Sequence, residues 1–397
     1  MAELKKVFSL TDAMALKGEN VEIPFGFTEI AYAAFETDEY IKFDHIKSIA
    51  LPDSVEIIQK QAFSGMRIES ITISKSVREI GIAAFHSCER LKEIIVDKDN
   101  EYYTVVNGDL YSKDGTVLHT CLSGKGKSVF TTPDSVKEIK DNAFSNCKSL
   151  KVFTISGSVT AITADAFMGC WNLKNILVDE NNRDFISVDG IIFSKGMDVL
   201  VKYPNLPHEE QPARYAVPES VSIIGDGAFS YIKGLTRIRF PEKLREIGNG
   251  AFTYCQGLTS VSLPTGIMKI GAGAFYSCDN LSKVYIPIGI EKLEQTLFYR
   301  CNKLESITIP PSVTEIGDGV FGYCKALRNI ELPEGLTKIE YYAFGNCNNL
   351  QAVRIPDSVE EIDSQAFVFC TALTVHCSKK SYAHEYCMKN KIRVRII

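Results

Sequence analysis

The residues of this sequence with the greatest capacity for chemistry are its cysteines. Nine of the twelve stand three residues after a recurring phenylalanine: Cys88, Cys147, Cys170, Cys255, Cys278, Cys301, Cys324, Cys347 and Cys370. If the copies stack one strand spacing apart, neighbouring thiols are close enough to consider disulfides or a metal site. A regular column has no preference for pairs, however, and one copy carries Ile232 there, as a small buried apolar position allows. We therefore interpret the column as buried structural thiols, with disulfides and a metal site as alternatives.

Three further cysteines lie outside this column. Cys121 is isolated, whereas Cys377 and Cys387 flank the C-terminal segment and are candidates for a disulfide. Cysteine makes up about 3% of the chain, well under the roughly 8–10% typical of a disulfide-stapled scaffold. The fold must therefore depend on a packed core.

His86 and Cys88 are the nearest approach to a base beside a nucleophile. Sequence neighbours on a turn seldom reach each other, and no third residue that would orient the pair is evident. Nucleotide-binding, zincin and nucleophile-elbow motifs are absent from the sequence. We therefore expect no catalytic, cofactor or metal site, with a thiol-based enzyme or redox protein as the remote alternative.

The phenylalanine belongs to a repeat that runs through most of the sequence. From Phe229 to Phe367 every step is 23 residues. Ile stands five residues before the Phe in eleven of twelve copies, and Pro stands eleven residues before it in ten. The copies are marked by Phe35, Phe63, Phe85, Phe144, Phe167, Phe229, Phe252, Phe275, Phe298, Phe321, Phe344 and Phe367.

One copy shows what each unit must form. Val261 and Leu263 alternate with serines, which is the pattern of a half-buried strand, and Pro264 ends it because it lacks an N–H. A unit of 23 residues cannot bury its apolar side alone, so the units must stack with parallel strands about 4.8 Å apart. The sequence predicts a mainly β solenoid, a right-handed stack of about twelve turns with short return strands or turns, on the order of 50 Å long.

Two steps depart strongly from 23 residues, and each contains a hairpin signal. The step from Phe85 to Phe144 is 59 residues and includes Asn107-Gly108, and the step from Phe167 to Phe229 is 62 residues and includes Asp189-Gly190. No linker rich in Pro, Gly or Ser separates independent cores. We expect one elongated domain whose parts are an N-terminal cap segment (1–20), the solenoid (21–373) and hairpin insertions at about 97–132 and 179–217.

Charge and hydropathy exclude two classes of partner. Forty-four basic residues against 49 acidic ones leave a net charge of −5, and the two signs are interleaved, so a dedicated nucleic-acid binder is not expected. The sequence contains no run of 18 apolar residues, so we expect no membrane insertion. The first residues carry no export signal.

The repeat unit, Cys-x-x-Leu-x-x-Ile/Val-x-Ile/Leu-Pro-x-x-Val-x-x-Ile-Gly-x-x-Ala-Phe, resembles the BspA-like class of bacterial and protist leucine-rich repeats, from about Val21 to the end. The hairpins resemble insertions of that family. Residues 374–397 resemble its C-terminal closing segment, a short helix and a last strand that cover the open end.

The resemblance implies a leucine-rich-repeat solenoid that binds a protein or glycan partner and is not an enzyme. Adhesion at a microbial cell surface, or interaction with a host or another cell, is the common role in the family. A cell-surface or secreted location follows from the resemblance, and an intracellular protein-interaction scaffold in the cytoplasm is the alternative that the missing export signal leaves open. We expect a monomer.

The outward positions of the strands are where a partner is expected to bind. Most hold small Ser and Thr, which suit any solvated strand, so a merely soluble face is the alternative. Arg and Tyr are favoured anchors in protein interfaces. Ile95 and Leu177 lie beside the hairpins, and we expect the hairpins to cover them. The candidate partner-binding residues are those that break the Ser/Thr columns: Arg237, Arg239, Lys283, Tyr285, Glu331 and Arg354.

Overall fold

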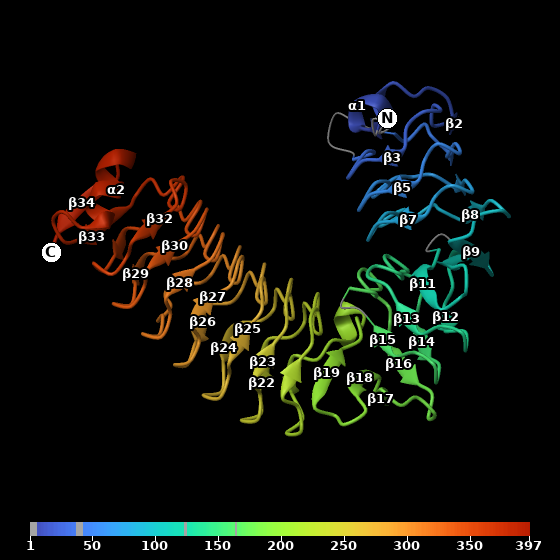
Figure 1. The fold of residues 1–397 in the computed structure, drawn as a ribbon. Helices are drawn as coiled ribbons and strands as arrows, with labels where there is room; N and C mark the ends of the chain where they lie inside the picture. The colour runs from blue at the N-terminus through green and yellow to red at the C-terminus, as the bar shows by residue number, and fades with distance from the viewer. Residues whose placement is uncertain (1–5, 37–42, 123–124, 163–164) are drawn as a thin grey trace. The chain divides into compact units, whose positions relative to one another are not determined.

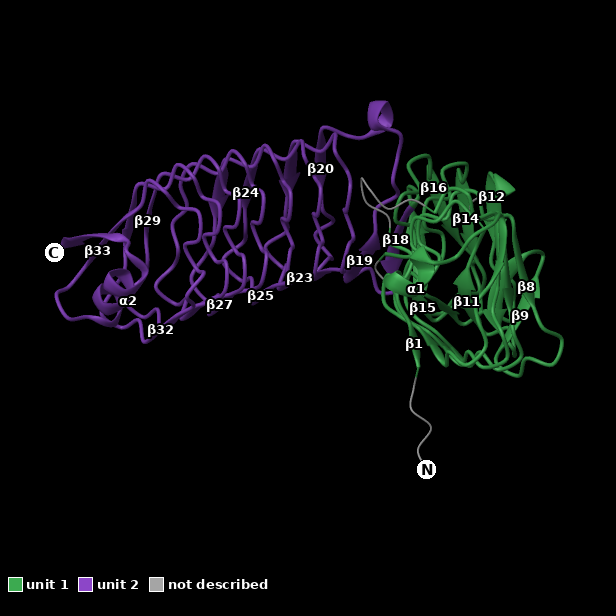
Figure 2. Cartoon of the chain, turned by 90° about the horizontal axis from the view of Figure 1, so that it is seen from above, with its two compact units in different colours: residues 1–190 green, residues 191–397 purple. Residues whose placement is uncertain are grey.

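The computed structural model describes residues 6–36, 43–122, 125–162 and 165–397. The chain divides into two compact units, unit 1 (residues 1–190) and unit 2 (residues 191–397), shown in Figures 1 and 2. Each unit is a stack of similar turns, and most turns have one strand of three or four residues and a short return strand of two. The predicted mainly β solenoid of leucine-rich-repeat type is confirmed.

In unit 1 the longer strands pair in parallel, and so do the return strands. The longer strands are β2 (Asn20–Glu22), β4 (Ser48–Ala50), β6 (Ser70–Ile73), β8 (Glu93–Val96), β12 (Val129–Thr131), β14 (Val152–Ile155) and β16 (Asn175–Val178). The return strands are β1 (Val7–Phe8), β3 (Glu29–Ile30), β5 (Ile57–Ile58), β7 (Glu79–Ile80), β11 (Val117–Thr120), β13 (Glu138–Ile139) and β15 (Ala161–Ile162). The short helix α1 spans Leu10–Met14.

Unit 2 has the same two kinds of strand. The longer strands are β20 (Arg214–Ala216), β22 (Arg237–Arg239), β24 (Ser260–Ser262), β26 (Lys283–Tyr285), β29 (Asn329–Glu331), β31 (Ala352–Arg354) and β33 (Thr374–Cys377). The return strands are β19 (Val199–Lys202), β21 (Ile223–Ile224), β23 (Glu246–Ile247), β25 (Lys269–Ile270), β27 (Lys292–Leu293), β28 (Glu315–Ile316), β30 (Lys338–Ile339) and β32 (Glu361–Ile362). A single 3-10 turn, η2, spans His208–Glu210.

The core follows from the repeat. In β24 the two serines are exposed and Val261 is buried, as the alternation predicts. The repeated phenylalanines stack along the inside of the turns, with ring centroids 5.4 Å apart for Phe252 and Phe275 and 5.8 Å for Phe275 and Phe298. These rings are fully buried, so each turn completes the core of its neighbours.

Each repeated phenylalanine lies in a bent corner that bonds to the next turn. Gly250 and Tyr254, two residues on either side of Phe252, have left-handed φ values of 57° and 59°. This conformation directs alternate N–H groups along the stack, and the Phe252 N–H donates to the Ala274 carbonyl at 2.8 Å. The corners therefore extend the hydrogen-bond ladder beyond the strands.

The two expected hairpins are present, but they are built into the stack. Strand β9 (Tyr103–Val106) pairs antiparallel with β10 (Asp109–Ser112) across Asn107-Gly108, both with positive φ. The other strands of this kind are β17 (Phe185–Val188) and β18 (Ile191–Ser194), and β18 pairs antiparallel with β19. Strands β11 and β19 then pair in parallel with the return strands β13 and β21. They are thus return strands themselves.

The two units together have about 17 turns, where about twelve were predicted. The prediction counted phenylalanines, and the turns of β11 and β19 have no phenylalanine in their corners. Terminal strands extend the stack further, because β1 precedes the first corner and β34 (Arg393–Ile396) follows the last. The helix α2 (Tyr382–Asn390) precedes β34, and its N-cap Ser381 accepts a bond from the His384 N–H at 3.2 Å. No helix among the described residues is long and apolar enough to cross a membrane.

Candidate partner-binding face

The six predicted residues all lie exposed on the longer strands of unit 2. Strand pairing aligns Arg237, Ser260 and Lys283 in one outward column. A second column contains Tyr285, whose side chain is 57% exposed, paired beside Ser262. The strands therefore hold these side chains on a rigid, regularly spaced surface, which we call the strand face of unit 2.

Two of the arginines are already paired with carboxylates. The guanidinium of Arg239 lies 3.0 Å from Glu219, and that of Arg354 lies 2.8 Å from Glu334. Both pairs are solvent-exposed, so each contributes at most about 1 kcal/mol and is easily exchanged for a partner's carboxylate. Arg237 forms no ion pair with any residue in the described ranges.

The strand face is interrupted between β26 and β29. Residues 305–309 form only one bridge there, Tyr285 to Thr308, instead of a regular strand. The gap is a shallow groove of about 470 Å³, whose lining includes Thr308, Glu331 and Arg354. Arg237, Arg239, Lys283 and Tyr285 are thus on the first sheet, whereas Glu331 and Arg354 flank the groove on the second.

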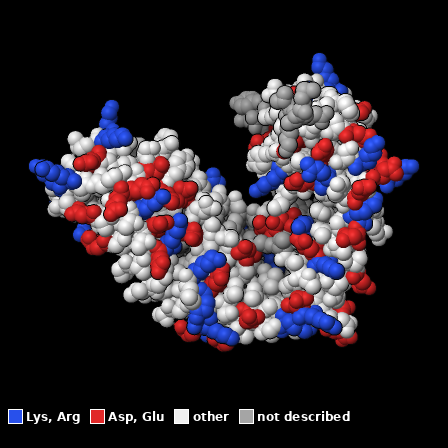
Figure 3. Space-filling view, viewed as in Figure 1, with Lys and Arg blue, Asp and Glu red and all other residues white. Residues whose placement is uncertain are grey.

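Sequence reasoning missed four basic residues on the same columns. Arg214 pairs beside Arg237 and lies 23 residues before Arg237 in the sequence. The repeat spacing alone could therefore have identified Arg214. His376, Arg393 and Arg395 extend the columns beyond β31. The last two come after α2, where the 23-residue spacing no longer applies. Figure 3 shows that acidic and basic side chains remain interspersed on the visible surface.

The expectation for Ile95 and Leu177 was wrong. Each side chain is 45% exposed. The second hairpin meets β16 at its edge, where the Ile176 N–H donates to the Gly190 carbonyl at 3.2 Å, so it continues the sheet sideways and does not cover the outward side chains.

A second feature that the repeat spacing could have revealed is a ladder of tyrosines beside the corners of unit 2. Ring centroids of Tyr231 and Tyr254 are 4.8 Å apart, and those of Tyr276 and Tyr299 are 5.2 Å apart. Arg300 adds a cation–π contact with Tyr323 at 5.5 Å. Because the rings pack on one another, they stiffen this edge of the stack.

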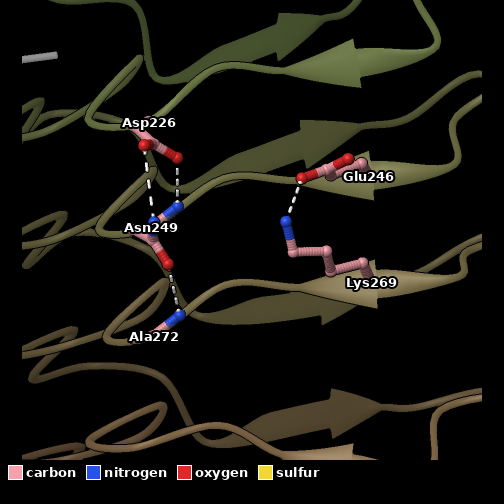
Figure 4. A network of polar contacts seen from close by, with 5 residues as sticks. All are labelled: Asp226, Glu246, Asn249, Lys269 and Ala272. Carbon is pink, nitrogen blue, oxygen red and sulfur yellow. Dashed lines mark hydrogen bonds and ion pairs between the residues drawn. The ribbon is translucent and has the colours of Figure 1, made fainter. Parts of the chain in front are cut away.

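Polar side chains on the return side of unit 2 are engaged in contacts between turns (Figure 4). The Asn249 N–H donates to the Asp226 carboxylate at 2.6 Å, and the Ala272 N–H donates to Asn249 Oδ1 at 2.9 Å. Lys269 lies 2.6 Å from Glu246. The strand face, in contrast, keeps residues such as Arg237 outside these contacts.

The cysteines are placed for structure. All twelve are free, including Cys377 and Cys387. In the uninterrupted repeats of unit 2, each thiol from Cys255 to Cys370 donates to the carbonyl of the corner phenylalanine in the preceding turn. Cys278 donates to Phe252 at 3.2 Å, and Cys301 donates to Phe275 at 3.3 Å. Within the described ranges, no group of three His, Cys, Asp or Glu side chains is arranged to hold a metal ion.

His86 and Cys88 are not brought together. The Nδ1 atom of His86 lies 2.6 Å from the Ser145 hydroxyl, and the Cys88 thiol donates to the Phe63 carbonyl at 3.1 Å. Burial raises the pKa of Cys88 to about 12 and lowers the pKa of His86. A neutral thiol that faces away from its base is a poor nucleophile.

These features define a class: a repeat solenoid of the leucine-rich type, with an exposed strand face and a core of stacked rings and thiols. More specifically, the chain belongs to the BspA type leucine rich repeat region family, which is matched in six copies over residues 13–106, 119–194, 213–328 and 291–395. Comparison with curated proteins found no match.

Several solved structures are similar to this chain. A leucine-rich repeat protein from Eubacterium ventriosum is 23% identical, with 82% of this chain and 83% of that chain covered and a TM-score of 0.58. A leucine rich cell surface protein from Faecalibacterium prausnitzii is 24% identical, with 93% and 90% covered and a TM-score of 0.42. The pneumococcal vaccine antigen PcpA is 18% identical, with 99% and 92% covered and a TM-score of 0.45.

Proposed function

We propose that this protein is a non-catalytic binding module that recognises a protein or glycan through the strand face of unit 2. One observation carries the proposal: cationic and aromatic side chains, Arg237, Lys283 and Tyr285 among them, stand exposed on a rigid sheet. Holding such anchors in place before binding reduces the entropy lost when a partner docks. Family membership supports the role, and adhesion at a microbial cell surface is the setting we propose.

The chemistry of the face favours a macromolecular partner that carries carboxylates. Arg214, Arg237 and Arg239 lie on two adjacent strands, and a shallow surface of this kind suits a macromolecule better than a small ligand. Mixed charges on the surface visible in Figure 3 and a net charge of −5 argue against nucleic acid. We propose that the protein binds as a monomer, which light scattering would check.

The test uses the double variant Arg239→Ala, Tyr285→Ala. Binding to an array of host matrix proteins and acidic glycans should fall on the order of a hundredfold, because each anchor contributes about 1–2 kcal/mol at an interface. Thermal unfolding should be unchanged, since neither side chain is in the core. The matched control, Glu246→Ala with Lys269→Ala, removes an exposed ion pair from the return side and should bind as the wild type does.

A different result would move the site. Unchanged binding by the double variant, with loss on Tyr102→Ala and Val106→Ala, would place recognition on the first hairpin, where these side chains are 47% and 44% exposed. That outcome would overturn the strand-face proposal.

A further inference from the structure

One corner of unit 1 is shorter than the others. In a regular turn, five residues lead from Ile139 in the return strand to Phe144 in the corner. In the preceding turn, only three lead from Leu118 to Cys121. Cys121 holds the corner position, because its N–H donates to the Ala143 carbonyl at 2.7 Å. This turn therefore lacks the residues that would project as a loop.

The missing loop leaves a cavity of about 730 Å³ between the corners on either side. It lies entirely within unit 1. We call it the corner slot, and its lining includes residues 81–86, 119–122, 140–142 and Ser145. The cavity takes the place of part of one turn in a stack of otherwise regular turns, so the solenoid determines its shape.

One wall of the corner slot presents main-chain donors without acceptors. In a regular corner such groups bond to the next turn, as Phe252 N–H does to Ala274. The equivalent N–H groups of Ala83 and Phe85, which line the slot, and of Ser87 beside it donate to no residue that the structure describes. Ala83 and Ser87 nevertheless keep the left-handed corner conformation, with φ of 58° and 57°. The donors are thus already oriented for an acceptor.

The opposite wall presents main-chain acceptors. In a regular corner the carbonyl of Asp318 accepts the Thr296 N–H at 2.7 Å. The equivalent carbonyl of Asp141, and that of Ser145, accept no hydrogen bond from the described part of the chain. A row of donors facing a row of acceptors is the pattern that a polypeptide strand satisfies with its two edges.

Side chains hold the two walls together at one end. His86 Nδ1 lies 2.6 Å from the Ser145 hydroxyl, and the Asn146 amide donates to the Ser87 hydroxyl at 2.8 Å. These contacts join equivalent positions of the two corners, 59 residues apart. The corner slot is therefore fixed before any ligand arrives.

The charges around the corner slot favour a cation. Four carboxylates and two lysines line it, which leaves an excess of two negative charges: Glu29, Glu79, Glu138 and Asp141 against Lys60 and Lys140. The lining histidines add no positive charge near neutral pH, because burial lowers the pKa of His119 to about 4 and lowers that of His86.

We propose that the corner slot binds an extended peptide segment of a partner protein that carries lysine or arginine. Main-chain carbonyls of the peptide accept from Ala83 and Phe85, and its N–H groups donate to Asp141 and Ser145. Its basic side chains meet the carboxylates at the rim. This site is separate from the strand face and does not depend on the function proposed for it.

The test selects random linear peptides displayed on phage against the full chain. Recovered peptides should be enriched in Lys and Arg, and their affinity should fall about tenfold or more for Asp141→Lys, which reverses a charge in the lining. The matched control is Asp318→Lys, at the equivalent position of a regular corner in unit 2, and it should bind normally. N-methylation of the peptide backbone should abolish binding, since it removes the donors.

Hydrogen exchange gives a second readout that does not depend on any variant. The Ala83 and Phe85 amides should exchange much faster than those of Gly250 and Phe252 in the free protein, and peptide should slow them. Recovery of no peptide, or of peptides that bind Asp141→Lys as well as wild type and leave these amides unprotected, would overturn the proposal. Retained peptide binding by Arg239→Ala, Tyr285→Ala separates this site from the strand face.

Discussion

At the scale of single residues, the thiol column shows why cysteine recurs. The repeat spacing alone indicates that the position is buried and takes a small apolar side chain, and Ile232 also meets this requirement. It does not reveal that each thiol donates to a carbonyl in the preceding corner, as Cys255 does to Phe229 at 3.1 Å. An S–H group that fills a small space and also pairs a buried carbonyl has an advantage over alanine there, because an unpaired buried acceptor is costly.

One cysteine should behave differently from the rest. Cys370 is partly exposed, and the neighbouring Cys347 thiol lowers its pKa, whereas burial raises the pKa values of Cys255 and Cys324 to about 12. We expect an aromatic disulfide reagent to label Cys370 quickly in the native protein and the other thiols only after unfolding. Cys370→Ser should remove the fast phase. Rapid labelling of several thiols would contradict the buried column.

His119 should make stability depend on pH. Burial first, and then Lys140, lower its pKa to about 4, whereas the unfolded value is near 6.5. The unfolded chain therefore binds the proton more readily between these values, so stability is fully present above about pH 6.5 and falls as the pH decreases towards 4. The neutral ring also packs against Tyr103, with centroids 5.2 Å apart.

Urea unfolding would measure the effect. Between about pH 7 and about pH 4.5, wild type should lose roughly 2–3 kcal/mol more than His119→Gln, which cannot take up a proton. Equal losses in the two proteins would show that His119 is not held neutral. Glu138 is the nearby acid that acts in the opposite direction to burial and Lys140.

At the scale of elements, the repeat predicted the strands well because one pattern specifies every turn. Ser260 and Ser262 face outward and Val261 inward, and Asn107-Gly108 forms the hairpin turn. The prediction did not show that β11 and β19 are themselves return strands. Their corners contain Cys121 and Tyr203 instead of phenylalanine, so a count based on that residue passed over them.

The core of an uninterrupted turn should be sensitive to truncation. Phe275 has no exposed surface and stacks between Phe252 and Phe298. Phe275→Ala should lower the free energy of unfolding by about 3–5 kcal/mol, because neighbouring turns cannot close the space. Met268→Ala, at a side chain 73% exposed, should change it by less than about 0.5 kcal/mol. A loss below about 1 kcal/mol for Phe275→Ala would show that the column is not packed.

At the scale of the whole molecule, the strand face was easier to predict than the corner slot. A column position is a fixed count from the repeat, so Arg237 and Tyr285 could be placed outward from sequence alone. The corner slot arises from residues that one turn lacks, and its ligand groups are main-chain atoms of Ala83 and Asp141. Neither residue type signals a site, and only three-dimensional stacking shows which hydrogen bonds are left unmade.

The thiol-to-carbonyl contacts also have a consequence for biosynthesis. In most turns the acceptor carbonyl lies 26 residues before its cysteine. The acceptor has therefore already emerged from the ribosome when the cysteine emerges. A turn that docks on its predecessor during synthesis shields its thiol without waiting for distant parts of the chain. A protein with nine aligned cysteines can therefore be made from the N-terminus onward with only its newest thiol open to oxidation. Slowed elongation should then protect it from mispaired disulfides, whereas refolding of the complete chain in oxidant exposes every thiol at once.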